Sequence, residues 1–200
     1  MSKVVVVTNR RLCRTDFRVR LGEVAACHPA GIILREKDLD EKTYADLARQ
    51  ALAICEAHGA RCILHTYHRV AADLGAKAIH LPLPLLRLLD DQDKASFEII
   101  GASIHAPEEA IEAQALGCTY VTAGHVFATD CKKGVPPRGL RFLEDVCHAV
   151  TIPVYAIGGI TPDNGPDALQ AGAKGVCTMS GPMVCENARE YLRDLAHALR

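Results

Sequence analysis

His125 is the residue of this sequence whose type and surroundings best suit acid–base chemistry. It follows an apolar run, Tyr120-Val121-Thr122-Ala123, and Gly124, and Val126-Phe127 come directly after it. An imidazole has a reference pKa of about 6.5, so it can accept and release a proton near neutral pH. The alternative is a histidine that is satisfied by backbone hydrogen bonds, and its position in the sequence leaves both interpretations open.

Two glycine-containing segments are candidates for binding phosphate. Residues 157–162 and 178–181 each follow an apolar run, and glycine lets the backbone N–H groups of such a loop approach an anion closely. Tight turns without a ligand are the alternative. The predicted phosphate contacts are Gly158, Gly159, Met179, Ser180 and Gly181.

Basic side chains can serve the other end of an anionic ligand. Arg35 and Lys37 are two residues apart at the end of a predicted strand, so they can point to the same side. The polar loop 129–134 ends in glycine and can fold over a ligand. Its Lys132 can meet an anion or stay solvated. Cys131 beside it is a possible nucleophile, but no base is evidently paired with it.

Three histidines raise the question of a metal site. His65, His68 and His80 lie near predicted strand ends, but no carboxylate stands beside them, and His65 with His68 alone makes an incomplete site. We therefore predict a structural or orienting role for these histidines, and no metal.

The elements that must position these residues follow one repeated pattern. A helix-compatible stretch, a glycine and a short apolar run recur in this order at Gly59, Gly75, Gly117 and Gly172, which predicts helices that end in a left-handed glycine before a strand buried on both faces. The predicted strands are residues 4–8, 31–35, 62–64, 78–81, 98–103, 120–123, 153–157 and 175–179. Helices are expected at residues 44–58, 106–116 and 192–199, with Pro107 at a first helical position and Thr161 as the cap of another helix.

Eight strands alternating with helices predict a single-domain (β/α)8 TIM barrel over residues 1–200. A doubly wound open sheet is the structural competitor, but no G-x-G-x-x-G follows the first strand. In a barrel, functional groups gather where the strands end, which is where all the candidates above lie.

The composition of the chain argues against several classes of function. The chain is 49% hydrophobic and has a net charge of −1, with no polybasic stripe and no apolar run near the roughly 20 residues of a membrane span. Its nine cysteines form no C-x-x-C pair, and Cys62 and Cys177 stand inside apolar runs, which favours reduced core thiols. We expect a soluble cytoplasmic enzyme, a homodimer, with no nucleic-acid or membrane partner.

Longer segments resemble the thiamine phosphate synthase superfamily. These are residues 34–39 (LREKDL), residues 156–162 (AIGGITP) and the regular strand spacing. Residues 124–134 (GHVFATDCKKG) are similar to the signature of its TenI branch, thiazole tautomerase. The resemblance implies that His125 moves a proton in the aromatisation of a carboxythiazole ethyl phosphate, without metal or cofactor, and that the two glycine loops hold the phosphate.

The synthase branch typically carries an Asn-Asp pair after strand three and an acid shortly after the His-Leu of strand four, which hold magnesium and pyrophosphate. Here those places read His65-Thr66 and Pro82-Leu83-Pro84. This departure favours the tautomerase branch. A non-catalytic regulator that binds thiazole phosphate and a thiamine phosphate synthase remain the alternatives.

Overall fold

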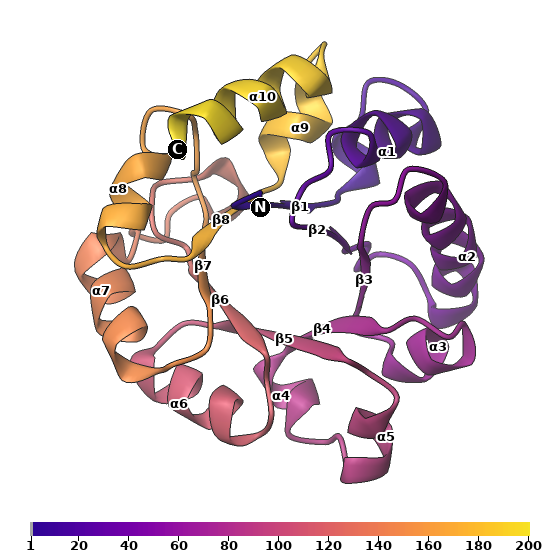
Figure 1. Ribbon diagram of the computed structural model, residues 1–200, viewed down its shortest axis with the longest axis horizontal. Coiled ribbons are helices and arrows are strands. Elements are labelled where there is room, and N and C mark those ends of the chain that lie inside the picture. The colour runs from indigo at the N-terminus through magenta and orange to yellow at the C-terminus, as the bar shows by residue number, and fades with distance from the viewer. Residues whose placement is uncertain (1) are drawn as a thin grey trace.

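The computed structural model describes residues 2–200, so Met1, the first residue of the predicted domain, lies outside the described residues. Eight parallel strands form a closed barrel in which each strand pairs with its neighbours in the sequence and β1 pairs with β8 (Figure 1). The strands are β1 (Val4–Val7), β2 (Gly31–Leu34), β3 (Cys62–His65), β4 (Ala78–Pro82), β5 (Ile99–Ile104), β6 (Tyr120–Gly124), β7 (Val154–Ile157) and β8 (Gly175–Thr178). The structure confirms the predicted (β/α)8 barrel.

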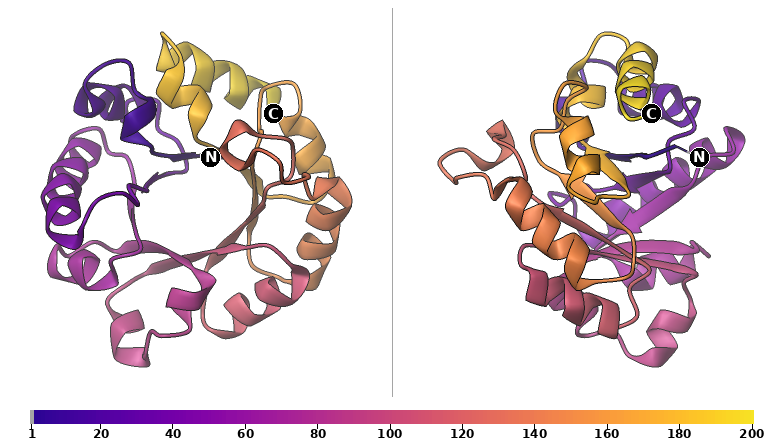
Figure 2. Two further views of the ribbon diagram at one scale, coloured as in Figure 1. Left: turned by 180° about the vertical axis from the view of Figure 1, so that it is seen from behind. Right: turned by 60° about the vertical axis from the view of Figure 1, so that its left-hand side comes forward.

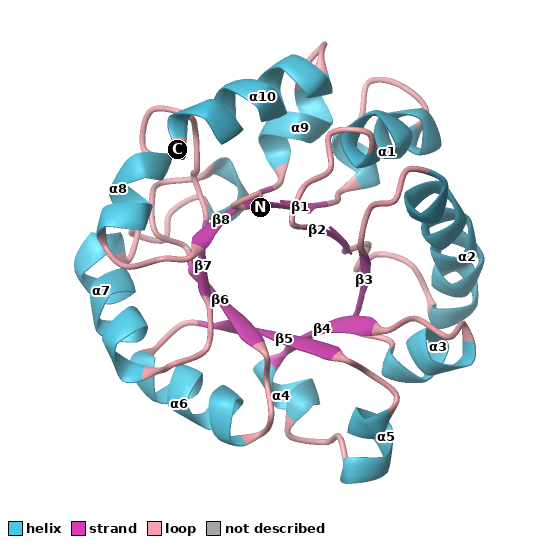
Figure 3. Ribbon diagram, in the orientation of Figure 1, coloured by secondary structure: helices cyan, strands magenta, loops and turns pink. Residues whose placement is uncertain are grey.

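Helices surround this barrel on its outside (Figure 3). They are α1 (Phe17–Ala25), α2 (Glu41–Ala57), α3 (His68–Asp73), α4 (Leu83–Leu86), α5 (Asp91–Ala95), α6 (Pro107–Ala115), α7 (Gly139–Ala149), α8 (Gly165–Gln170), α9 (Ser180–Val184) and α10 (Ala188–Ala198), with 3-10 turns η1 (Arg10–Leu12) and η2 (Asp130–Lys132). Among the described helices, none is long and apolar enough to cross a membrane.

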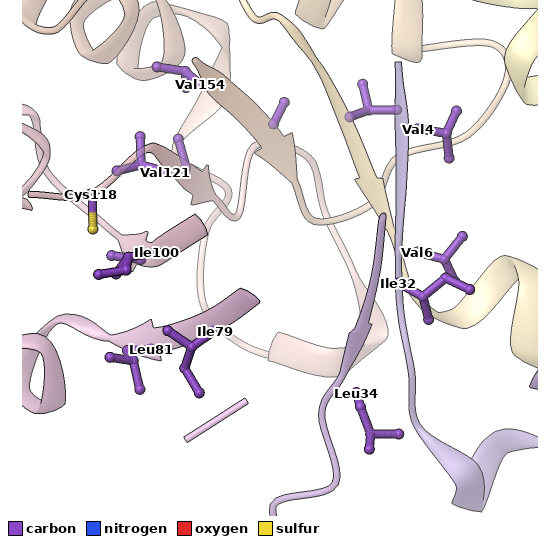
Figure 4. Close-up of a cluster of buried hydrophobic side chains, with 14 of the residues drawn as sticks. Val4, Val6, Ile32, Leu34, Ile79, Leu81, Ile100, Cys118, Val121 and Val154 are labelled. Atoms are coloured by element: carbon purple, nitrogen blue, oxygen red, sulfur yellow. The ribbon is translucent and has the colours of Figure 1, made fainter. Parts of the chain in front are cut away.

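Alternate side chains of the strands form two apolar layers. Val4, Val6 and Ile32 belong to the larger cluster between the strands and the helices (Figure 4). Val5 and Val7 belong to a smaller cluster inside the barrel. Both faces of a strand are therefore covered, which explains why the strands read as continuous apolar runs.

A glycine and a tyrosine on neighbouring strands pack against each other in the interior of the barrel. Gly101 of β5 pairs with Tyr120 of β6, and a Cβ at Gly101 would lie 2.2 Å from the tyrosine ring. Because the glycine has no side chain, the Tyr120 ring occupies its space and its hydroxyl reaches Nδ1 of His80 at 2.9 Å. The interior at this level is thus packed with side chains.

The predicted helix ends are mostly confirmed. The glycines at 59, 75, 117 and 172 all have positive φ, between 62° and 96°, as expected for residues that terminate a helix. Pro107 is the first residue of α6, with two glutamates in its first turn. The cysteines are all free, with Cys177 buried and Cys62 half-buried.

The prediction that Thr161 caps a helix is wrong. α8 begins four residues later, at Gly165, and Asn164 is its N-cap residue. The Asn164 side chain instead bonds inside the preceding loop: its Oδ1 accepts a hydrogen bond from the Thr161 N–H at 2.9 Å, and its amide donates to the Gly159 carbonyl at 2.8 Å. The Thr161-Pro162 pattern therefore marks a turn that is closed by an asparagine, which competes with helix formation.

Candidate active site

The two ends of the barrel differ in the chemistry of their side chains. At the amino-terminal end lies a depression of about 250 Å³, lined mainly by apolar and tyrosine side chains, with Arg61 the one charged lining residue. At the carboxyl-terminal end, which we call the mouth, a cavity of about 240 Å³ is lined by Lys37, His65, Tyr67 and their neighbours. Barrel enzymes place their reacting groups at the mouth, where the predicted site residues also lie.

A long loop between β6 and α7 stands out from the barrel at the mouth (Figure 2, right). We call residues 129–138 of this loop the lid. It contains η2 and an exposed Cys131, and Lys133 pairs with Asp130 at 3.8 Å within it. Among the residues described, the lid makes two hydrogen bonds to residues outside it, and both go to His125.

His125 directly follows β6 and lies between the lid and the turn after β7. Its side chain is 5% exposed. On one side, a Cβ at Gly158 would lie 2.3 Å from the His125 Cβ, so only glycine leaves room for the histidine there. On the other side, the Arg138 N–H donates to the His125 carbonyl at 3.0 Å. The glycine turn and the lid together fix this residue.

The two ring nitrogens of His125 have different surroundings. Nε2 contacts the carbonyl oxygen of Val135 at 3.2 Å. Nδ1 is buried, and none of residues 2–200 forms a hydrogen bond with it. A buried polar atom left unpaired costs about 1–3 kcal/mol, so this nitrogen is a position where a water or a ligand atom would bond.

The glycine turn after β7 has a conformation that other residues rarely adopt. Gly158 and Gly159 have φ values of 101° and 67°, and a Cβ at Gly159 would lie 2.3 Å from the carbonyl oxygen of Ala128. Both glycines are therefore required by the close approach of the segment that carries His125. This packing reason is independent of any ligand.

The turn after β8 is positioned by buried side chains. A Cβ at Gly181 would lie 2.1 Å from the Tyr191 ring, and the fully buried Arg20 donates to the Cys185 carbonyl at the end of α9 at 2.7 Å. Within residues 2–200, several backbone N–H groups of the two turns donate no hydrogen bond: those of Gly158, Gly159, Met179, Ser180 and Gly181. These groups are the donors that an anion would need.

Three cations lie near one another at the mouth. Partial burial lowers the pKa of Lys37, and the positive charges of Arg35 and Lys132 lower it further, so the three side chains lie within electrostatic reach of one another. Across residues 2–200, none of them forms an ion pair. Neighbouring like charges without counter-charges form a site that an anionic ligand would neutralise.

Two stacked histidines lie below these cations, inside the barrel. The His65 and His80 rings are 5.7 Å apart and nearly parallel. Both His80 nitrogens have partners, Tyr120 at 2.9 Å and Ser103 at 2.8 Å, and Nδ1 of His65 contacts the Thr66 hydroxyl at 2.5 Å. Both His80 nitrogens are thus satisfied within the barrel, which agrees with the predicted structural or orienting role.

Burial and charge keep both rings neutral. Burial lowers the pKa of His80 to about 3, and the nearby Arg35 and Lys37 contribute. Burial also lowers the pKa of His65 well below its ordinary value, and the nearby His80, Arg35 and Lys37 lower it further. The stacked pair is thus an uncharged floor beneath the cationic side of the mouth.

The carboxylate that lines the mouth cavity is already hydrogen-bonded within the protein. Glu36, the one acidic residue that lines the mouth cavity, accepts hydrogen bonds from the Thr8 hydroxyl at 2.7 Å and from Arg10 at 3.0 Å. His68 lies apart from His65 on α3, 3.8 Å from Asp93. In residues 2–200, no three His, Cys, Asp or Glu side chains gather closely enough to bind a metal.

Sequence reasoning missed the contacts between distant segments. Nothing in the local sequence shows that the Val135 carbonyl meets His125, although the Pro136-Pro137 pair marks the lid as a stiff segment. The inward position of Ser103 and Thr122 on their strands was available from strand alternation. Their bonding to His80 required the closed barrel.

Fold and site together define a (β/α)8-barrel enzyme whose mouth combines free backbone donors, three cations and a buried histidine. Residues 4–181 match the TMP-TENI family, described as thiamine monophosphate synthase, and the chain belongs to this family. It is therefore a member of an enzyme family of thiamine biosynthesis, as the resemblance implied.

Individual relatives agree with this assignment. The chain is 35% identical to the thiamine-phosphate synthase of Shouchella clausii over 174 residues, which cover 84% of this chain and 81% of that protein. It is 30% identical to the thiamine-phosphate synthase of Pyrococcus horikoshii over 193 residues, 96% of this chain and 92% of that one. The thiamine phosphate pyrophosphorylase structure from Pyrococcus furiosus superposes with a TM-score of 0.84 at 27% identity, over 98% of this chain and 95% of that one. The TenI branch stays a prediction, because these relatives are named as synthases or pyrophosphorylase.

Proposed function

We propose that this member of the family is a thiazole tautomerase, which converts a non-aromatic carboxythiazole ethyl phosphate into its aromatic tautomer. The observation that carries the proposal is the buried His125, which is held between the Gly158 turn and the lid with its Nδ1 open. An imidazole with one open nitrogen suits a reaction that only moves a proton.

The reaction breaks one C–H bond and forms another. His125 takes the proton from the ring carbon that bears the carboxylate and delivers it to the exocyclic carbon, so the histidine is unchanged at the end of the cycle. Aromaticity of the product supplies the driving force. The protein therefore needs to orient the substrate and to carry one proton, without metal or cofactor.

The two sides of the mouth would hold the two anionic ends of the substrate. The free N–H groups of Gly158, Gly159, Met179, Ser180 and Gly181 are suited to the phosphate. Arg35 and Lys37 are suited to the carboxylate, and Lys132 of the lid adds charge above it. A substrate bound in this way would lie with its ring next to His125.

A direct assay follows the growth of aromatic thiazole absorbance from the dearomatised phosphate. His125→Asn is expected to lower the rate by at least about a hundredfold, because the amide keeps the polarity of the side chain but cannot carry the proton. Near-normal turnover in this variant would remove His125 from the mechanism. Tight binding of the product with no turnover in the unmodified protein would favour the regulator instead.

The second candidate is thiamine-phosphate synthase, and the names of the relatives favour it. The residues of the mouth fit its magnesium poorly, since Glu36 is already bound by Thr8 and Arg10 and no acid follows β3 or β4 at the predicted places. Magnesium-dependent release of pyrophosphate by the purified chain would establish this activity and displace the tautomerase proposal.

A further inference from the structure

Backbone atoms of the lid contact both the side chain and the backbone of His125. The Val135 carbonyl meets Nε2 at 3.2 Å, and the Arg138 N–H donates to the His125 carbonyl at 3.0 Å. A carbonyl oxygen can only accept a hydrogen bond, so Nε2 must carry the proton in this contact. A neutral ring with its proton on Nε2 has its lone pair on Nδ1.

Nδ1 is the atom that the protein leaves open. It is buried and has no partner within the chain. The lone pair that the Val135 contact directs to Nδ1 thus lies on the ring nitrogen that the described residues leave unsatisfied. The two observations are independent of each other, and both point to Nδ1 as the nitrogen that exchanges a proton.

The sequence of the lid fixes the direction of the Val135 carbonyl. Pro136 and Pro137 follow it, which locks φ at two positions and restricts Val135 and Pro136 to extended conformations. The Val135 N–H donates to the Lys132 carbonyl at 3.1 Å, and Arg138 is tied to His125. The segment from Val135 to Arg138 is therefore a stiff strap that is held at both ends.

We propose that Val135-Pro136-Pro137 is a positioning element that holds His125 with its proton on Nε2 and presents Nδ1 to the substrate. The catalytic part of this inference rests on the proposed function. The lone pair on Nδ1 takes the proton from the substrate carbon, and the N–H···O bond to Val135 strengthens while the ring is positively charged. The proton then leaves Nδ1 for the exocyclic carbon, and the neutral tautomer is restored.

The first test is nuclear magnetic resonance on the ligand-free full chain, labelled with ¹⁵N-histidine. His125 is expected to give an Nε2–H cross-peak that is protected from exchange with water, and its loss in His125→Asn assigns it. The double variant Pro136→Gly/Pro137→Gly should lose this cross-peak, while Val135→Ala, which retains the carbonyl, should keep it.

Three outcomes would each overturn the proposal. The unmodified chain could show a cross-peak from Nδ1–H or no His125 cross-peak at all, or the double glycine variant could keep the Nε2–H cross-peak unchanged. The substitutions are at exposed positions of the lid, so the fold should tolerate them, and circular dichroism checks this.

Kinetics separate this inference from the proposed function. In the tautomerase assay the double glycine variant should lose about tenfold in kcat with KM within about twofold, while Lys133→Gln, an exposed lid substitution outside the strap, stays near the unmodified rate. If the chain has no tautomerase activity, the spectroscopic result still decides whether the lid fixes the ring. If activity depends on His125 but neither the cross-peak nor kcat responds to the prolines, the positioning role alone is wrong.

Discussion

His80 and His125 are both buried, His80 inside the barrel and His125 at its mouth, but their ring nitrogens differ in what they contact. His80 bonds Tyr120 and Ser103 through its two nitrogens, and burial lowers its pKa to about 3. His125 bonds one carbonyl through Nε2 and leaves Nδ1 without a partner. Burial alone therefore does not distinguish the two histidines. The number of ring nitrogens that the described residues satisfy does.

The largest effect is expected from Gly158→Ala. Its φ of 101° costs an L-residue about 1–2 kcal/mol, and the new Cβ would also displace His125, so we expect tautomerase activity to fall by more than about a hundredfold. Gly117→Ala is the matched control, because its φ of 93° is similar but nothing lies within 4 Å of the added carbon. Gly117→Ala should lower the free energy of unfolding without lowering tautomerase activity. Equal activity in the two variants would show that the turn does not position His125.

Matched asparagine substitutions test the two histidines themselves. His80→Asn leaves Tyr120 or Ser103 unpaired in the interior and should lower the free energy of unfolding by about 2–3 kcal/mol. His125→Asn removes one unpaired nitrogen and one hydrogen bond to the exposed lid, so it should cost only about 1 kcal/mol. Urea unfolding measures both. If His125→Asn lowered the free energy of unfolding more than His80→Asn does, the comparison would be reversed.

The depressed pKa of His80 predicts a pH dependence of stability. Between its folded value of about 3 and an unfolded value of about 6.5, the unfolded chain binds more protons, so the free energy of unfolding falls as the pH is lowered from 6.5. The slope is about 1.4 kcal/mol per pH unit for each such histidine, and His65 contributes in the same direction. Urea unfolding should be measured between pH 6.5 and 5, where the carboxylates do not yet titrate. In this range His80→Asn should reduce the slope of the unfolding free energy against pH by the contribution of one histidine.

The smallest effect is expected on the cationic side of the mouth. Lys37→Gln should raise KM for the phosphorylated substrate by about three- to tenfold at low salt, and less at high salt, because it removes one unpaired charge. Lys133→Gln should change little, since Lys133 is highly exposed and pairs with Asp130. If the two variants behave alike, the charges at the mouth do not take part in binding.

The local sequence pattern was sufficient to predict the fold, and it also suggested part of the candidate site. The buried runs and the left-handed glycines at 59, 75, 117 and 172 predicted strands and helix ends correctly, because both depend on neighbours in the chain. His125 was proposed in the same way, as a histidine at the end of a strand, and its catalytic role stays a prediction.

Contacts across the barrel could not be predicted in this way. The partners of His80 come from β5 and β6, and the fit between Gly158 and His125 depends on how β7 lies against β6. The start of α8 was misplaced because the Asn164 side chain took the bonds that a Thr161 cap would have made. Fold-level similarity does not resolve which activity within the family a member has.

The paired Gly101 and Tyr120 also set a limit on what the barrel can accept. The tyrosine ring occupies the volume of the missing side chain and ends at His80, so the depth of any ligand site is fixed by a residue that no ligand needs to touch. An engineer who wanted room for a bulkier substrate would have to shorten Tyr120 and refill the gap above Gly101 in the same step, because either change alone leaves a void or a collision.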